Sequence, residues 1–321
     1  MKKYDVTALG ELLIDFTENG TSGQGNPIYE ANPGGAPCNV LAMLAKLERK
    51  TAFIGKVGQD IFGNRLKEIV AETGIDISNL VTDKDVRTTL AFVETFPDGD
   101  RDFSFYRNPG ADMMLREDEV NEDILRDTKI FHFGTLSMTH EEVRRATKKA
   151  VETAKAAGAV LSFDPNLREP LWNFLEEAKE QTAYGLSKCD FLKISDNEIR
   201  WFTGEEDFDA GIRRLREQYD IPLIVLSMGK DGSRAYYKDL RVEVAPFLQE
   251  NTIETTGAGD TFGACCLHYV LQCGLDGFHE DSLREMLVFA NAAASIITTR
   301  KGALRVMPTM NEVQELIKKF K

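Results

Sequence analysis

A Thr/Gly-rich segment that begins at Glu254 combines two groups that a phosphoryl transfer needs. It reads ETTGAGD and runs directly into the apolar pattern TFGACCL. The backbone amides of Gly257, Ala258 and Gly259 are expected at a helix N-terminus, where free N–H groups bind anions. Asp260 follows in the first turn, where a carboxylate can accept the proton of a hydroxyl that attacks phosphorus. Taken alone, the motif fits a carboxylate that only stabilises the start of a helix better than it fits a catalytic base.

A second segment has the groups that bind a neutral polyol. It reads NPGGAPCN from Asn32 to Asn39 and leads into a helical pattern. Gly34 and Gly35 can expose backbone donors, and the Asn39 amide offers both a donor and an acceptor to sugar hydroxyls. An ordinary helix start with Pro37 in its first turn is the alternative interpretation.

Two charged residues are expected where strands end. Asp15 follows the first strand, and Arg168 lies in the segment FDPNLR after another apolar run. Ligands bind at the carboxyl ends of strands in open α/β sheets. Asp15 could accept hydrogen bonds from two neighbouring hydroxyls, and Arg168 could face a phosphate. Solvated loop charges are the alternative for both.

The elements that would position these residues alternate along the chain. Short apolar runs predict strands, and apolar residues at helical spacing predict helices between them. Strands are expected over Tyr4–Leu9, Thr51–Val57, Ile130–Leu136, 159–163, 191–194 and 223–226, and helices over Cys38–Leu47, Ile61–Thr73 and His140–Ala157. Repeated strand–helix alternation predicts an α/β domain over residues 1–321, with a doubly wound, mostly parallel sheet flanked by helices.

Two segments, 12–32 and 88–107, break this alternation. The first contains the turn-rich run GTSGQGNP, and the second has two alternating runs around Pro97-Asp98-Gly99, a hairpin signature. We interpret them as insertions that form a small β-sheet lid over one end of the core; ordinary surface hairpins are the alternative. The apolar lid strands could also pair between two subunits of a homodimer.

Composition excludes several other classes of protein. The 321 residues carry a net charge of −13, which gives no broad basic face for nucleic acid. The five cysteines include no C-x-x-C pair, which is typical of reduced thiols in a cytosol. The N-terminus does not resemble a signal peptide, and the longest apolar stretch, near Leu287–Ile297, is too short to span a bilayer. A cytoplasmic protein without a membrane segment is therefore expected.

Two long motifs resemble the signatures of a known family. GGAPCNVLAMLAKLERKTAFIGKVGQD (34–60) and ETTGAGDTFGACCL (254–267) are similar to the N- and C-terminal signatures of the ribokinase-like, phosphofructokinase-B type carbohydrate kinases. The resemblance extends from GELLID (10–15) to TRKGA (299–303). It implies a ribokinase-like fold with a β-sheet lid, and the transfer of a phosphoryl group from ATP to a sugar hydroxyl.

The resemblance also implies roles for single residues. Asp260 corresponds to the catalytic base, and Gly257, Ala258 and Gly259 correspond to the anion hole. The positions implied near the sugar or its phosphate end are Asp15, Gly34, Gly35, Asn39, Arg107 and Arg168. The positions implied at the nucleotide are Lys193, Ser227, Gly229, Gly232 and Asn291. Glu198 corresponds to the glutamate of the family's N-x-x-E motif, which organises Mg²⁺ and phosphate through water, so ATP and Mg²⁺ are the expected cofactors.

This sequence departs from the family pattern at two positions. Ser195 replaces the asparagine of N-x-x-E, as in the Ser-Asp-x-Glu pattern of fructokinase-like members, so Glu198 keeps its implied role. Glu254 replaces the aspartate that usually begins the second signature and helps to bind a monovalent cation. The longer side chain argues against a potassium site.

The substrate follows from the resemblance less directly. GGAPCN, FYRNPGADMML, DPNLREPLW and KISDNEI together resemble fructokinases most, and fructose is the expected sugar. Ribokinase-like members more often carry a lysine where Ala36-Pro37 stands. The 2-keto-3-deoxygluconate kinases tend to have a tyrosine near the lid arginine; Phe105 argues against that substrate, whereas Tyr106 keeps it open. A non-catalytic binding protein on the same fold is a further alternative, against which the intact GAGD sequence argues.

Overall fold

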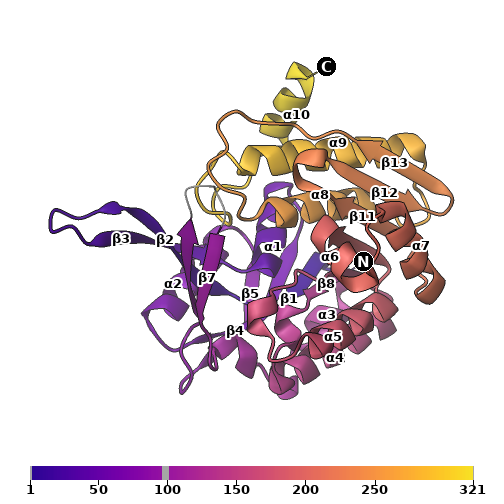
Figure 1. Ribbon diagram of the computed structural model, residues 1–321. Helices are drawn as coiled ribbons and strands as arrows, with labels where there is room; N and C mark the ends of the chain where they lie inside the picture. Colours follow the sequence, from indigo (N-terminus) through magenta and orange to yellow (C-terminus); the bar gives the residue numbers. More distant parts are fainter. Residues whose placement is uncertain (1, 96–100, 321) are drawn as a thin grey trace.

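A nine-stranded sheet forms the centre of the computed structural model, which describes residues 2–95 and 101–320 (Figure 1). The strand order is β13-β12-β11-β10-β9-β8-β1-β4-β5. In this order, the strands from β11 through β1 to β5 run parallel to one another. Strands β12 and β13 complete the other edge, where β12 is antiparallel to both β11 and β13. The strands are β1 (Tyr4–Leu9), β4 (Thr51–Gly58), β5 (Asp76–Asp83), β8 (Thr128–Gly134), β9 (Val160–Asp164), β10 (Phe191–Ser195), β11 (Leu223–Ser227), β12 (Ser233–Tyr237) and β13 (Leu240–Val244).

Helices cover both faces of this sheet because its strands are apolar on both faces. All eight residues of β4 are buried, for example. The helices are α1 (Ala36–Lys46), α2 (Ile61–Glu72), α3 (Glu122–Arg126), α4 (Glu141–Ala156), α5 (Leu175–Lys188), α6 (Asp196–Thr203), α7 (Phe208–Gln218), α8 (Ala258–Cys273), α9 (Glu280–Ile297) and α10 (Met310–Lys319). One apolar core joins the sheet to α1, α2, α8, α9 and α10, and a second joins it to α3 through α7. Figure 1 shows α8 and α9 on one side and α3, α4 and α5 on the other.

The doubly wound, mostly parallel sheet expected from the sequence is therefore confirmed. Predicted strand Tyr4–Leu9 has those bounds, whereas the strand predicted over Ile130–Leu136 begins and ends two residues earlier. The helix predicted over His140–Ala157 begins at Glu141 because His140 is its N-cap, and Nδ1 of His140 accepts the Glu142 N–H at 3.4 Å. Within residues 2–95 and 101–320, no helix combines the length and the apolar character needed to cross a bilayer.

A separate four-stranded sheet among the described residues forms the expected lid. Its strands are β2 (Leu13–Thr21), β3 (Pro27–Gly34), β6 (Leu90–Thr95) and β7 (Arg101–Tyr106), in the order β3-β2-β6-β7. They come from the two segments that interrupt the alternation of the core. The predicted turn at Pro97-Asp98-Gly99 lies outside the described residues. In Figure 1 the β2–β3 hairpin projects well beyond the body of the molecule.

The two faces of the lid differ in character. Asp15 on β2 pairs in register with Ala91 on β6, which pairs with Phe105 on β7, so these three share one face. Phe16 and Phe92 lie on the opposite face, where their rings stack with centroids 4.9 Å apart. The lid therefore has a face with the Asp15 carboxylate and an opposite, aromatic face.

Candidate active site

A cavity of about 830 Å³ contains most of the residues singled out from the sequence. It lies where β1, β9, β10 and β11 end, and residues of the lid form one wall. The expected site residues that line it are Asp15, Gly35, Asn39, Arg168, Lys193, Glu198, Ser227, Gly229, Gly232, Gly257, Ala258, Gly259, Asp260 and Asn291. Two others, Gly34 and Arg107, do not line it.

Helix α8 begins inside the cavity with the GAGD sequence. Its N-cap, Gly257, has φ 76°, and a Cβ there would lie 2.7 Å from the Ala303 Cβ, so only glycine fits. Thr261 N–H donates to the Gly257 carbonyl at 2.8 Å, the first bond of the helix. Ala258 N–H already donates to the Thr255 carbonyl at 3.2 Å. The amides of Gly259 and Asp260 are then the first-turn donors that an α-helix leaves without intrahelical acceptors.

Asp260 is held in place by a residue of the other signature. The side-chain amide of Asn39 donates to Oδ2 of Asp260 at 2.8 Å, although the two residues are 221 positions apart. Burial raises the pKa of the Asp260 carboxyl, and the Asn39 hydrogen bond and the charge of Lys193 oppose part of that rise. A raised pKa makes the ionised carboxylate a stronger base than an exposed aspartate.

Lys193 supplies a buried positive charge beside Asp260. Its Nζ lies 3.0 Å from Oδ2 of Asp164, at the end of β9. Burial alone would lower the pKa of Lys193, but the carboxylates of Asp164, Glu198 and Asp260 outweigh it and raise that pKa. Nζ would lie 3.3 Å from a Cβ built on Gly259, so the ammonium sits against the start of α8. A permanently charged lysine at this point can meet a phosphate.

Glu198 is fully engaged by hydrogen bonds at the start of α6. Its Oε2 accepts from Ser195 N–H at 2.8 Å and from Ser195 Oγ at 2.7 Å, and its Oε1 accepts from Leu167 N–H at 2.9 Å. Burial favours the neutral carboxyl, but the Lys193 charge and these bonds outweigh it and lower the pKa of Glu198. The residue is therefore ionised, with both oxygens occupied.

Asp15 and Gly35 line another end of the cavity, and Gly34 packs directly against the Asp15 carboxylate. A Cβ on Gly34 would lie 2.2 Å from Oδ2 of Asp15, so glycine leaves room for the carboxylate. Burial raises the pKa of Asp15 to about 7, and the positive charge of Arg168 opposes the rise. Oδ1 of Asn39 is buried and has no hydrogen-bond partner among the described residues. This end thus offers a carboxylate and a free amide oxygen, the acceptors that sugar hydroxyls need.

Arg107 lies outside this arrangement. Its guanidinium is buried and donates to Asp112 Oδ2 at 2.8 Å, to Thr139 Oγ1 at 2.8 Å and to the Leu136 carbonyl at 3.0 Å. Asp112 also accepts a bond from Thr89, at the start of the second lid segment. Arg107 therefore joins the two ends of that segment to the core.

The third part of the cavity lies beyond β11 and is shaped by backbone turns. Gly232 has φ 92°, and a Cβ there would lie 2.2 Å from the Val244 carbonyl oxygen. The Asn291 amide donates to the carbonyls of Val244 and Ala245 at 3.3 and 3.1 Å. Asn291 thereby fixes the start of the loop whose residues Pro246, Phe247, Leu248 and Gln249 line the cavity.

Comparison with known proteins identifies the family. Residues 3–310 match the family described as "pfkB family carbohydrate kinase". The chain belongs to this family. "Probable fructokinase-4" of Arabidopsis thaliana is 42% identical over 99% of this chain and 98% of its own length. "Fructokinase-2" of Solanum lycopersicum is 40% identical over 98% of this chain and 96% of its own length.

Solved structures of this carbohydrate kinase family agree with the fold. The fructokinase of Xylella fastidiosa with bound ATP superposes with a TM-score of 0.90 at 31% identity, covering 100% of this chain and 99% of that one. A double-mutant fructokinase of Vibrio cholerae O395, with fructose, ADP and a potassium ion bound, gives a TM-score of 0.86 at 25% identity, covering 99% of each chain. The ribokinase-like fold, with its large sheet and separate small lid, is thus established for this kinase.

The donor set of this kinase suits a magnesium ion that is held mainly by phosphates and water. In the described part of the chain, no group of three His, Cys, Asp or Glu side chains converges as a metal cage. Mg²⁺ commonly keeps several waters and takes one or two carboxylates plus substrate phosphates. Glu198 is ionised and lines the cavity, and its occupied oxygens favour contact with the ion through water.

Three contributors to the site were not predicted from the sequence. Glu11 and the 246–249 loop line the cavity, and Asp164 pairs with the lining residue Lys193. Glu11 and Asp164 could have been found because both are carboxylates at strand ends, in segments already quoted for their neighbours. The loop has no chemical motif.

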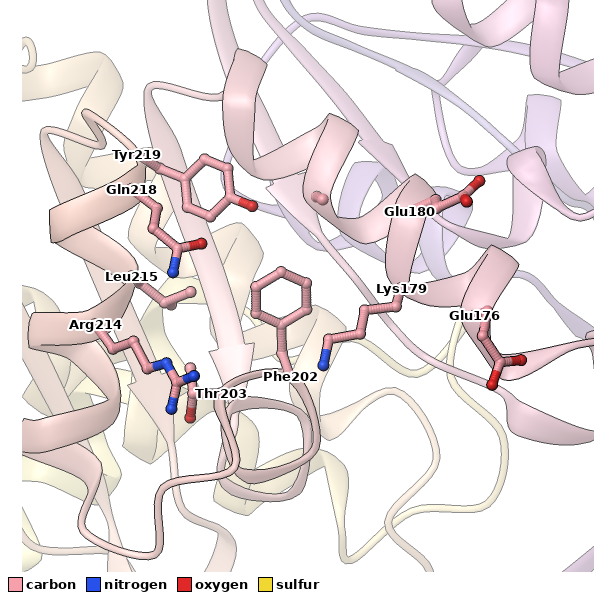
Figure 2. A pocket seen from close by; sticks show the side chains of 10 residues that line it. Glu176, Lys179, Glu180, Phe202, Thr203, Arg214, Leu215, Gln218 and Tyr219 are labelled. Atoms are coloured by element: carbon pink, nitrogen blue, oxygen red, sulfur yellow. The ribbon is translucent and has the colours of Figure 1, made fainter.

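A second cavity, of about 440 Å³, lies between α5, α6 and α7 (Figure 2). Phe202 stands at its centre, with Lys179 on one side and Tyr219 on the other. The Lys179 ammonium is 5.8 Å from the Phe202 ring centroid, and Arg214 pairs with Glu205 at 3.0 Å. None of the residues singled out from the sequence lines this cavity.

Proposed function

We propose that this chain transfers the γ-phosphate of ATP to a hydroxyl of fructose. The observation that carries the proposal is the position of Asp260, at the start of α8 and bonded to Asn39 at 2.8 Å, in one cavity with Asp15. The fructokinase names of relatives that are about 40% identical over nearly the whole chain support fructose as the sugar. We further propose that residues 1–321 act as one kinase domain whose lid segments are residues 12–32 and 88–107.

Asp260 would act as the general base. Its carboxylate accepts the proton of the attacking sugar hydroxyl, and its raised pKa favours that transfer. The amides of Gly259 and Asp260, with Lys193 beside them, stabilise the charge on the transferring phosphoryl group. Gly257 and Ala258 shape this anion hole, because the Ala258 amide is itself bonded to Thr255.

The sugar would lie against Asp15, Gly35 and Asn39, which line the same cavity. Asp15 and the free oxygen of Asn39 accept hydrogen bonds from its hydroxyls, and Gly35 exposes backbone. Arg168 is exposed and lines the cavity, and its guanidinium would meet the phosphate end of the sugar. Arg107 holds the second lid segment through Asp112 and acts on the sugar only by that route.

The nucleotide would occupy the part of the cavity lined by Ser227, Gly229, Gly232 and Asn291. A Mg²⁺ ion bound with ATP at this end would supply charge neutralisation for the phosphates. Glu198 would orient it through water. Glu254 accepts the Gly302 N–H at 2.7 Å, and this bond ties its carboxylate to the neighbouring segment and away from a potassium ion.

Fructose is favoured over an anionic sugar by the sugar end of the cavity. Phe105 lines it where acid kinases of this family are expected to carry a tyrosine hydroxyl. The Asp15 carboxylate would also repel the carboxylate of 2-keto-3-deoxygluconate. Ribose remains the neutral alternative.

We also propose that the kinase acts in the cytoplasm and forms homodimers through the aromatic face of the lid. Tyr29 and Tyr106 pack beside Phe92 on this face, and the two tyrosines are 43% and 66% exposed. Exposed aromatic side chains that gather on one sheet favour contact with a second protein surface.

Turnover measured on a panel of acceptors tests the proposal. ADP release would be followed with Mg·ATP and fructose, ribose, tagatose, glucose, adenosine, fructose 6-phosphate or 2-keto-3-deoxygluconate. We expect fructose to give the highest kcat/KM. A tenfold preference for ribose or for 2-keto-3-deoxygluconate would refute fructose as the preferred substrate. If no acceptor on the panel is phosphorylated, the result would favour a non-catalytic binding protein.

A further inference from the structure

Helix α1, which carries Asn39, cannot cap its own N-terminus. Its N-cap is Gly35, at φ 132°, and a glycine has no side chain to accept the first N–H groups. The Ala36 N–H instead donates to Oε1 of Glu11 at 2.8 Å. The cap therefore comes from a residue 25 positions earlier, just after β1.

The contact between Glu11 and this turn is close and buried. Only 4% of Glu11 is exposed. A Cβ on Gly35 would lie 2.3 Å from the Glu11 carbonyl oxygen, and a Cβ on Gly10 would lie 2.4 Å from Cγ of Pro37. The segments 10–11 and 35–37 therefore pack closely together, and the Glu11 carboxylate accepts the Ala36 N–H within this contact.

Burying a carboxylate here has a cost. Burial raises the pKa of Glu11 to about 7, while hydrogen bonds from its own amide and from Ala36 N–H oppose the rise. Asp112 adds a negative charge nearby and Arg107 a positive one, and the thiol of Cys38 on α1 lies within electrostatic range. Burying a carboxylate costs free energy unless hydrogen bonds offset the lost hydration. Here the bond from Ala36 N–H offsets part of this cost and fixes the start of α1.

A single residue, Asn39, connects α1 to the proposed base. Asn39 lies in the first turn, where its N–H donates to the Gly35 carbonyl at 3.0 Å. Its side-chain amide donates to Asp260, and its Oδ1 remains free for a ligand. Any shift of the Ala36 end of α1 would move both the sugar acceptor and the partner of Asp260.

We propose that Glu11 is a positioning residue, which caps α1 from outside and thereby fixes Asn39 against Asp260 and the sugar. The inference rests on the function proposed above. Glu11 acts because one of its oxygens is near enough to accept the Ala36 N–H. Its charge and proton transfer play no part in this role. Replacing it should impair use of the sugar and leave the nucleotide end of the cavity unaffected.

Two variants of Glu11 distinguish the position of its acceptor oxygen from its negative charge. Glu11→Gln keeps the length and an acceptor oxygen but removes the charge. Glu11→Asp keeps the charge but withdraws the carboxylate by about 1.5 Å. We expect Glu11→Gln to stay within about threefold of wild type and Glu11→Asp to lose about 10- to 100-fold in kcat/KM for fructose, because small misplacements at a reacting centre cost that much. The KM for ATP should change by less than twofold in both, an approximate bound for an untouched subsite.

Asp207→Ala is the matched control. Asp207 caps the remote helix α7 by accepting Ala210 N–H at 2.7 Å, so its loss removes a comparable cap far from the cavity. We expect it to lower Tm and to leave kcat/KM for fructose unchanged. A Glu11→Asp variant within twofold of wild type, or a Glu11→Gln variant as impaired as Glu11→Asp, would overturn the proposal.

Amide exchange separates this inference from the proposed function. Peptides covering residues 35–41 should exchange faster in Glu11→Asp than in wild type and Glu11→Gln. That comparison holds whether or not fructose is the substrate. Equal exchange in all three proteins would overturn the capping role even if fructose is turned over.

Discussion

Replacing Asp260 by Asn removes the proposed base and little else. The Asn oxygen can still accept the 2.8 Å bond from Asn39, so the link between the two signatures survives. An amide cannot take the hydroxyl proton. Loss of a general base typically lowers the rate by about 10²–10⁴-fold, which corresponds to about 2.7–5.5 kcal/mol in activation free energy. We therefore expect kcat to fall into this range with an unchanged KM for ATP.

The direction in which Asp260→Asn changes the stability of the fold also follows from the pKa. The pKa of Asp260 is raised in the folded chain, so the fold binds this proton more tightly than the unfolded chain does. Above the unfolded pKa the ionised carboxylate therefore weakens the fold, and this penalty is complete once pH exceeds the folded pKa. The neutral Asn lacks the penalty. We expect an equal or slightly higher Tm at pH 8.

The assay combines kcat with fructose, a thermal melt and a nucleotide titration on the same preparations. Asp207→Asn, at the N-cap of α7, is the matched control for an Asp-to-Asn change at a helix start. It should keep wild-type kcat. A well-folded Asp260→Asn enzyme that keeps more than about a tenth of wild-type kcat, well short of the expected loss, would refute a base at this position.

Three further predictions test other parts of the site. Potassium should activate weakly or not at all relative to a bulky organic cation at equal ionic strength, because Glu254 is bonded to Gly302; a severalfold requirement would show that the cation site is intact. Saturating fructose should slow amide exchange in residues 12–32 and 88–107, because the lid closes over the sugar to exclude water; unchanged exchange in both segments would rule out closure. The KM for fructose should rise severalfold from pH 8 to pH 6, because the raised pKa of Asp15, about 7, lets this acceptor protonate in that interval. A flat KM would remove the ionised Asp15 from sugar binding, and Asp15→Asn should abolish the pH dependence.

Strands buried on both faces could be predicted from sequence because they read as unbroken apolar runs. The run LIVL became part of β11, and all four of its residues are buried. Strand β5, DISNLVTD, was missed because it lies at the sheet edge and has little apolar sequence. Strands β12 and β13 were missed because they form a short antiparallel hairpin that breaks the strand–helix alternation. Such edges depend on their neighbours more than on their own residues.

The local motifs of the site could also be predicted, but their connections could not. GAGD places an amide cluster and a carboxylate together because the residues are adjacent in one helix start. The Asn39–Asp260, Glu11–Ala36 and Asp164–Lys193 contacts join distant segments, and only the packed fold brings them together. For Arg107, the sequence position suggests a contact with the ligand. In the fold its guanidinium donates hydrogen bonds to Asp112 and Thr139 instead.

Coupled formation of ADP and fructose phosphate would show the proposed phosphoryl transfer itself. Purified protein would be incubated with Mg·ATP and fructose, and ADP and fructose phosphate would be quantified in the same samples by mass spectrometry. We expect one fructose phosphate for each ADP, no ADP above background without sugar, and loss of both products in Asp260→Asn. ADP formed without fructose phosphate, or equal yields from the Asp260→Asn protein, would contradict the proposed transfer.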